Sequence, residues 1–146
     1  MEILREKNFN KIKDFVKKNS GKKIMFSSDD DDLNRRVLEK AKVDIILLSQ
    51  KNRKDFQKQR NSGLNEIMSK IAKKNKIKIG IDFDEIIESS GKIKVDILGR
   101  IRQNIFLCKK SKIEMKFICQ KYKRDVYDLK ALGLILGMPT WMTKGI

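Results

Sequence analysis

The sequence predicts a fold of the α/β class with parallel strands. Short runs of apolar, mostly β-branched residues alternate with longer stretches of helical periodicity. Each of these runs is apolar on both faces, which is typical of strands in a parallel sheet covered by helices. The chain has 146 residues, whereas an eight-stranded α/β barrel typically takes about 250. We therefore expect an incomplete barrel or a small open sheet, formed by a single domain over residues 1–146.

Four buried strands are predicted. Each is short, rich in Ile, Val, Leu or Phe, and bounded by polar or turn-forming residues. They are 23–27 (KIMFS), 43–49 (VDIILLS), 77–83 (IKIGIDF) and 114–119 (EMKFIC). A fifth strand near either terminus remains open.

Between the strands, apolar residues recur with the period of an amphipathic helix. Helices are predicted over 31–42, 63–75, 96–110 and 125–137, and a basic one at the N-terminus. We expect Asn61 or Ser62 to cap the second of these and Asp125 the fourth. The side chains expected to face the core include Ile3, Leu4, Phe9, Ile12, Phe15 and Val16 at the N-terminus, Leu64, Ile67, Met68 and Ile71 in the second helix, Ile97, Ile101, Ile105 and Cys108 in the third, and Val126, Leu129, Leu132 and Leu136 in the fourth.

The charge is strongly positive. Lys and Arg number 35 against 19 Asp and Glu, a formal net charge of +16. Such an excess repels itself within a compact domain, and nucleic acid is its commonest counterpart. The alternative is a charged surface of the thermophilic or halotolerant kind, but such surfaces are nearer to balance. The lysines of the first helix (Lys7, Lys11, Lys17 and Lys18) are interpreted as a solvated face that adds diffuse attraction.

The residues offer little for catalysis. The chain has no histidine, and it has no glycine-rich phosphate-binding pattern, so histidine-assisted nucleophiles and His-rich metal sites are excluded. Two acidic clusters follow strands: Asp29 to Asp32, and Asp82 with Asp84. They could hold Mg²⁺ for a metal-dependent nuclease, which is the alternative function. Capping of helices by these carboxylates is the simpler interpretation. We predict no catalytic residue and no metal site.

The first residues are too highly charged to resemble a signal peptide, so we expect none, and no apolar run approaches the roughly 18 residues of a membrane span. Cys108 and Cys119 lie in apolar segments, where thiols commonly pack as small hydrophobic side chains. We expect a cytoplasmic protein that binds no membrane.

Three stretches, in this order and each behind a strand, carry a resemblance to a known family. They are RNSGLNEIMSKIAKKN (60–75), GRIRQNIFLCKKSKI (99–113) and RDVYDLKALGLILGM (124–138). Together they resemble the archaeal and eukaryotic ribonuclease P protein component 3, the thirty-kilodalton-type subunit, over roughly residues 43–138. The chain departs from the family pattern at Asn61, where Asp is frequent, and in CQKYKRD (119–125), and it is shorter at both ends.

The resemblance implies a TIM-like α/β barrel related to metal-dependent hydrolases, without their catalytic metal ligands. It also implies a protein that assists a catalytic RNA in removing 5′ leaders from precursor tRNA. The implied partners are ribonuclease P RNA, precursor tRNA and ribonuclease P protein component 2, the last in a heterotetramer. We further expect that the protein binds no cofactor and that the RNA requires Mg²⁺.

Binding of RNA or of a partner is predicted for residues of these stretches and of the basic segment just before the third. Arg60 can bind phosphate in front of a turn and a helix start; the alternative is an ion pair with Asp82 or Asp84. In the third predicted helix we expect Arg100 and Asn104 to share an outward side, and Gly99 to admit another backbone. Basic residues around Tyr122 could grip a backbone while Tyr122 or Tyr127 stacks a base, unless both tyrosines are packing residues. The predicted residues are Arg60, Ser62, Gly63, Asn65, Arg100, Arg102, Gln103, Asn104, Lys121, Lys123 and Arg124. Trp141 is expected to be buried in its own fold, or else to anchor a partner.

Overall fold

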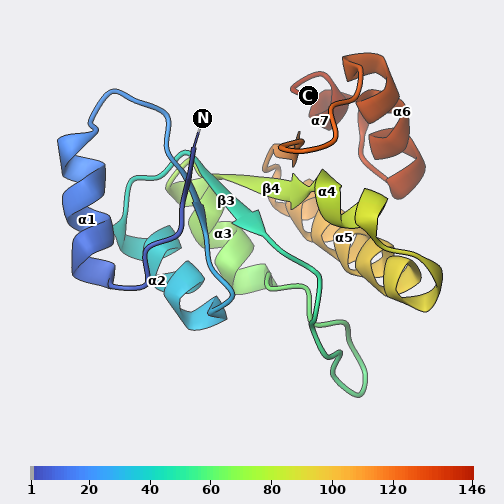
Figure 1. The fold of residues 1–146 in the computed structure, drawn as a ribbon, viewed down its shortest axis with the longest axis horizontal. Coiled ribbons are helices and arrows are strands. Elements are labelled where there is room, and N and C mark those ends of the chain that lie inside the picture. The colour runs from blue at the N-terminus through green and yellow to red at the C-terminus, as the bar shows by residue number, and fades with distance from the viewer. Residues whose placement is uncertain (1) are drawn as a thin grey trace.

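The computed structural model describes residues 2–146. It contains one parallel sheet of five strands in the order β1-β2-β3-β4-β5 (Figure 1). The strands are β1 (Ile3–Leu4), β2 (Met25–Ser27), β3 (Ile45–Leu48), β4 (Lys78–Asp82) and β5 (Met115–Ile118). Each strand pairs with the next one along the chain, with Met25 opposite Ile45 and Ile79 opposite Met115. This winding is that of a partial TIM-like barrel, so the predicted fold class is confirmed.

Seven helices are described. They are α1 (Phe9–Lys18), α2 (Asp31–Lys40), α3 (Glu66–Lys74), α4 (Phe83–Glu88), α5 (Gly91–Ser111), α6 (Val126–Leu136) and α7 (Thr140–Thr143). Figure 1 shows α1 and α2 at one end of the sheet and α5, α6 and α7 at the other. Among the described residues, no helix combines the length and the apolar character that a membrane span requires.

The two faces of the sheet are packed differently, because alternate residues of a strand point to opposite sides. Ile46, Ile79 and Met115 belong to the large core formed with the helices. On the other face, Met25, Ile45 and Leu47 form a small cluster with Ile3 and Ile118. The helices therefore cover one face, as in a barrel whose interior is the other face.

The four predicted strands are confirmed, and β1 supplies the fifth. Ile3 and Leu4 were expected on a helix but lie in β1, and the first helix begins only at Phe9, capped by Asn8. The short helix α4 was not predicted, because its six residues span too few turns to show a period. Asp125 caps α6, as predicted, by accepting from the Tyr127 N–H at 2.7 Å.

Three side chains predicted to face the core are exposed. Ile67 of α3 is 57 % exposed, because the helix packs through the side that carries Met68 and Ala72. Val126, the first residue of α6, and Phe15, near the end of α1, are 48 and 41 % exposed. The apolar stripe read from a sequence is thus wider than the contact that the helix makes.

Candidate functional site

A long loop, residues 49–65, leaves the carboxyl end of β3 and leads into α3. Loops beyond about 12–15 residues without secondary structure are uncommon in small domains and usually functional. Figure 1 shows this loop extending away from the sheet below α3. The carboxyl ends of parallel strands are also where α/β proteins place their sites. We therefore describe how the loop is held and what it exposes.

Arg100 of α5 holds the loop with three hydrogen bonds. Its Nε donates to Asp55 Oδ1 at 2.9 Å, its Nη1 to the Gln50 carbonyl at 2.9 Å and its Nη2 to the Arg53 carbonyl at 2.9 Å. The residue is 5 % exposed. A buried guanidinium whose donors are occupied in this way is a structural clamp on the loop backbone.

Asp55 connects several parts of this clamp. Besides Arg100, its carboxylate accepts from the Asn61 backbone N–H at 2.9 Å and from Arg60 Nη1 at 3.3 Å. The hydrogen bond from Arg100 is the main cause that lowers the pKa of Asp55, with smaller contributions from the Asn61 N–H and the charge of Arg60. Arg60 also lies 3.5 Å from Asp96 of α5. Asp55 therefore stays ionised and bridges the two arginines.

Arg60 lies over Gly99 of α5. A Cβ atom at Gly99 would stand 2.5 Å from the Arg60 Cζ. The glycine thus admits a guanidinium, whereas the prediction that it admits another backbone was wrong. The alternative ion pair of Arg60 with Asp82 or Asp84 was also wrong, because the loop turns back toward α5 and brings Arg60 to Asp55 and Asp96.

Arg53 forms a second clamp that the sequence did not reveal. Its Nη1 and Nη2 donate to the two Asp31 oxygens at 2.8 and 3.0 Å, and its Nε donates to the Ser49 carbonyl at 2.6 Å. Gly63 has a φ of +80°, and a Cβ there would lie 2.5 Å from Arg53 Nη2. Gly63 is therefore required both by its backbone conformation and by the packed guanidinium.

Ser62 is the point where the loop meets α5. Its carbonyl accepts from Gln50 Nε2 at 2.9 Å and from Asn104 Nδ2 at 3.1 Å. Gln103 Nε2 donates to the Ser62 hydroxyl at 2.9 Å and to the Arg60 carbonyl at 2.8 Å. These side chains supply donors to the carbonyls of Arg60 and Ser62, which lie in a segment without regular secondary structure.

The prediction that Arg100 and Asn104 face outward was therefore wrong. Both are buried, at 5 and 2 % exposure, because loop 49–65 folds over this side of α5. Gln103 is half-buried beside them, and only Arg102 of this group is exposed. A polar stripe on a helix does not distinguish solvent from a loop rich in backbone carbonyls.

The cap of α3 is Asn65, whose side chain accepts from the Met68 N–H at 2.8 Å. The prediction of Asn61 or Ser62 as the cap was wrong, because both residues are committed to the loop. The helix consequently begins at Glu66.

Glu85 of α4 fixes the start of the loop and was not singled out from the sequence. It accepts from the Gln50 N–H at 2.9 Å and the Lys51 N–H at 3.2 Å, and from the Ser49 hydroxyl. The residue is buried. Its position in the run DFDE, directly behind a strand, was the available signal.

Asp82 and Asp84 have separate tasks. Asp82 caps α4 by accepting from the Glu85 N–H at 3.4 Å. Burial, and next the neighbouring charge of Glu85, raise the pKa of Asp82 to about 6. Asp84 accepts from the backbone N–H groups of Lys121 and Tyr122 at 3.0 and 3.2 Å, and so holds the loop after β5.

The first acidic cluster is divided in the same way. Asp30 caps α2 through the N–H groups of Asp32 and Leu33, while Asp31 pairs with Arg53. Within residues 2–146, no group of three or more His, Cys, Asp or Glu side chains is arranged to hold a metal ion. These carboxylates cap helices and form hydrogen bonds or ion pairs that hold loops.

The basic residues after β5 are exposed and lie on the loop that Asp84 holds. Lys121 lies 3.5 Å from Glu88 and over the Tyr122 ring. Lys123 donates to the Cys119 carbonyl at 2.6 Å, and Arg124 stacks on Phe83 at 5.6 Å from the ring centroid. Tyr122 is half-buried, as a packing residue would be, and Tyr127 is exposed.

The clamped loop exposes an aromatic tip. Phe56 is 61 % exposed, and its N–H donates to the Gln59 carbonyl at 2.9 Å, which closes the turn. Lys54 and Lys58 flank it and are exposed. Most of the residues predicted to bind a partner thus hold the loop in place. Its exposed tip, Phe56, was not predicted, because a single Phe between lysines forms no recognisable sequence pattern.

Fold and site together define the class: a parallel α/β protein of the TIM-like barrel type, with an arginine-clamped loop at the carboxyl ends of its strands. Similar sequences share one name. A protein of Methanococcus maripaludis named "Ribonuclease P protein component 3" is 29 % identical over 139 residues, which are 94 % of this chain and 56 % of that protein. A protein of the same name from Methanococcoides burtonii is 31 % identical over 113 residues, which are 75 % of this chain and 44 % of that protein. Another from Methanosarcina mazei is 30 % identical over 99 residues, which are 68 % of this chain and 38 % of that protein.

The resemblance seen in the sequence is therefore confirmed: the chain is a relative of ribonuclease P protein component 3. It spans little more than half the length of the curated relatives that it matches over most of its own length. No family profile matches it. The fold also agrees with a chain in the "cryo-EM structure of archaeal Ribonuclease P with mature tRNA", with a TM-score of 0.80 at 24 % identity over 97 % of this chain and 62 % of that one.

Proposed function

We propose that the chain is a non-catalytic protein subunit of ribonuclease P, which assists the catalytic RNA in removing 5′ leaders from precursor tRNA. The observation that carries this is the similarity to ribonuclease P protein component 3 over nearly the whole chain. The clamp supports it further. Arg60 and Ser62 of the first resembling stretch and Arg100 and Gln103 of the second meet in one network.

In this proposal the clamped loop makes contact with a partner. Lys54, Lys58 and Phe56 offer charge and an aromatic surface on a rigid support, which suits a ribose-phosphate backbone with an accessible base. Lys121, Lys123 and Arg124, on the loop that Asp84 holds, add further positive charge. Neutralising phosphates in this way would let the RNA fold and bind substrate at lower Mg²⁺, with the Mg²⁺ held by the RNA.

The proposed assembly contains ribonuclease P RNA, precursor tRNA and ribonuclease P protein component 2, the last in a heterotetramer. Filter binding of the chain to ribonuclease P RNA tests the RNA contact. Each phosphate neutralised should add about 0.7–0.9 to the slope of log affinity against log salt. A slope near zero would contradict the proposal.

The rival function, a metal-dependent nuclease, makes a different prediction. The purified chain would then cleave RNA with Mg²⁺ and no added ribonuclease P RNA, and Asp82→Asn or Asp84→Asn would abolish the cleavage. A pure protein-interaction module would instead assemble with component 2 and show no RNA-binding loss in a Lys54→Glu, Lys58→Glu double variant, which changes only exposed residues of the clamped loop.

A further inference from the structure

Lysines gather at the amino-terminal ends of the strands, opposite the clamped loop. One hollow there is lined by Lys13 and Lys17 of α1, by Lys22 and Lys23 before β2, and by Lys40 and Lys42 before β3. A second hollow is lined by Lys73 and Lys76 before β4, by Lys78 of β4, and by Lys112 before β5. We call the two hollows together the lysine end.

The two hollows adjoin each other. Parallel strands place their amino ends side by side, about 4.8 Å apart from one strand to the next. Lys78 of the second hollow donates its backbone N–H to the carbonyl of Asp44, in the first, at 2.9 Å. The two hollows therefore lie on neighbouring strands at the same end of the sheet.

The charge of this surface exceeds what the fold itself requires. The four helices that precede these strands end here, and their C-termini favour lysine because each carries about −0.5 charge, or roughly −2 in total. The two hollows contain ten lysines and two carboxylates, Asp44 and Glu114, a surplus of eight out of the formal +16. About six positive charges thus remain without a structural reason.

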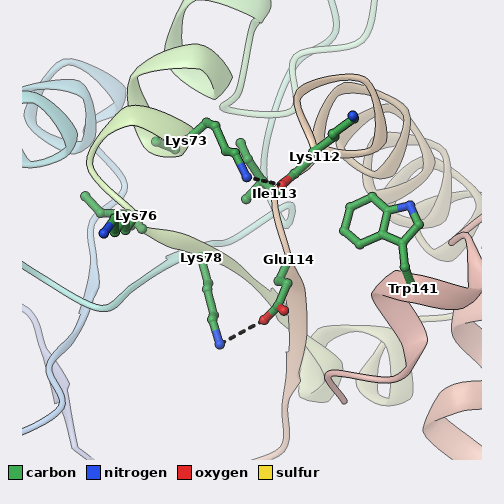
Figure 2. A pocket seen from close by; sticks show the side chains of 9 residues that line it. Lys73, Lys76, Lys78, Lys112, Ile113, Glu114 and Trp141 are labelled. Atoms are coloured by element: carbon green, nitrogen blue, oxygen red, sulfur yellow. Dashed lines mark hydrogen bonds and ion pairs between the residues drawn. The ribbon is translucent and has the colours of Figure 1, made fainter.

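The second hollow also contains the single tryptophan of the chain. Figure 2 shows Trp141 beside Ile113 and Lys112, with Glu114 and Lys78 below. The cavity has a volume of about 530 Å³, and Ala72 and Ile77 contribute to its apolar lining. Trp141 is 40 % exposed, although the next residue, Met142, is fully buried and anchors α7. The indole is thus held in place with part of its surface accessible.

Two of the lysines at this hollow are engaged by neighbouring groups. Lys73 donates to the Lys112 carbonyl at 3.1 Å, and Lys78 pairs with Glu114 at 2.9 Å. The hydrogen bond from Lys78, with the nearby charges of Lys116 and Lys73, lowers the pKa of Glu114 despite some burial. In the part of the chain that the structure describes, the side chains of Lys76 and Lys112 form no ion pair.

We propose that the lysine end binds single-stranded RNA, with a base stacked against Trp141 and the phosphates on the lysines. Proteins bind single-stranded nucleic acid with positive charges that lie along the phosphate backbone and with aromatic side chains on which bases stack. An acidic protein could pair with the lysines, but this would not explain why the Trp141 indole is accessible beside the apolar residues of the hollow. The inference goes beyond the proposed function, because it assigns RNA contact to the end of the sheet opposite the clamped loop.

The test uses the fluorescence of Trp141 in the whole chain, titrated with a short oligouridylate at several salt concentrations. We expect saturable quenching that weakens with salt. The variant Lys76→Gln with Lys112→Gln should lower the salt slope by about 1.4, since each phosphate contact on a single strand contributes about 0.7. The matched control, Lys92→Gln with Lys94→Gln at the start of α5, removes the same charge and should leave the slope unchanged.

Four outcomes would overturn the inference: no binding at low salt, binding measured by filter retention that leaves Trp141 fluorescence unchanged, equal loss in the two double variants, or equal quenching by polyglutamate. The last would indicate an acidic protein as the occupant. Circular dichroism of both variants confirms folding. None of these results decides whether the chain supports leader removal, so failure here is distinct from failure of the proposed function.

Discussion

The Arg100 guanidinium and the Asp55 carboxylate, 45 residues apart in the chain, meet at 2.9 Å beneath the loop that follows β3. This contact joins the helix of one resembling stretch to the loop that leads into another. Residues that a sequence comparison groups as motifs thus form one structural unit. Their main physical task is to hold a long loop in one conformation.

Replacement of Arg100 by alanine should destabilise the fold. It removes three hydrogen bonds, takes one of three donors from Asp55 and leaves two loop carbonyls without the Arg100 donors, which we expect to lower the free energy of unfolding by about 2–3 kcal/mol. Urea denaturation measures this. The control is Arg102→Ala on the exposed side of the same helix, with an expected change within about 0.5 kcal/mol. Equal effects would mean that the clamp contributes nothing.

Replacement of Gly63 by alanine should cost more than its conformation alone explains. The new Cβ would meet the Arg53 guanidinium at 2.5 Å, in addition to the strain of φ +80°. Gly21→Ala is the control, because Gly21 has φ +88° and nothing within 4 Å of the added atom. We expect about 1 kcal/mol for the control, from backbone strain, and a clearly larger loss of unfolding free energy for Gly63→Ala. Equal losses would mean that Arg53 moves aside freely.

Asp82 should make stability depend on pH. Its pKa is about 6 in the fold and near 3.8 when unfolded, so the folded state binds the proton more tightly. Stability from this group is present below pH 4 and is lost as the pH rises to about 6. Asp82→Asn keeps an oxygen for the α4 cap and should raise the free energy of unfolding at pH 7 by roughly 1–2 kcal/mol, allowing for solvent screening.

The advantage of the Asp82→Asn variant should shrink toward zero near pH 4, as measured by urea denaturation across this range. The matched variant is Asp128→Asn in the first turn of α6. Because a helix N-terminus favours a carboxylate, this variant should show no gain in the free energy of unfolding at pH 7. A constant difference between Asp82→Asn and the original chain would contradict the assignment.

Phe56 should matter for assembly and little for folding. Its side chain is exposed at the tip of the clamped loop, so Phe56→Ala should change the unfolding free energy by less than about 0.5 kcal/mol. Loss of one stacked base costs about 1–3 kcal/mol, so we expect affinity for ribonuclease P RNA to fall by 5-fold or more, roughly. Phe106→Ala, an exposed phenylalanine on α5, is the control. Similar losses from both would show that the tip has no special role.

The sequence contained enough to predict the strands, since runs such as IILL and KIGID are buried on both faces and have few alternatives. It also singled out Arg60, Arg100 and Gln103 of the clamp, but not Asp55, Arg53 or Glu85. The sequence could not show whether the polar side chains of α5 point to solvent or to another part of the chain. Arg100 and Asn104 look like surface residues on a helical wheel, because the loop that buries them has no periodicity of its own.

The lysine end was missed for a related reason. Lys17, Lys40, Lys76 and Lys112 lie in four separate segments, and each is explained locally by a helix end. Only the parallel pairing of β2 to β5 brings them to one edge. Trp141, expected to be buried, is half-accessible because α7 is anchored by its neighbour Met142 instead.

The central claim is tested most directly by the Mg²⁺ dependence of leader removal. Ribonuclease P RNA and precursor tRNA are incubated with this chain, with component 2, with both or with neither, and the Mg²⁺ concentration at half-maximal cleavage rate is measured. We predict a lower midpoint with both proteins than with component 2 alone, and the same rate of cleavage by the chain without RNA as by buffer. An unchanged midpoint would contradict the account.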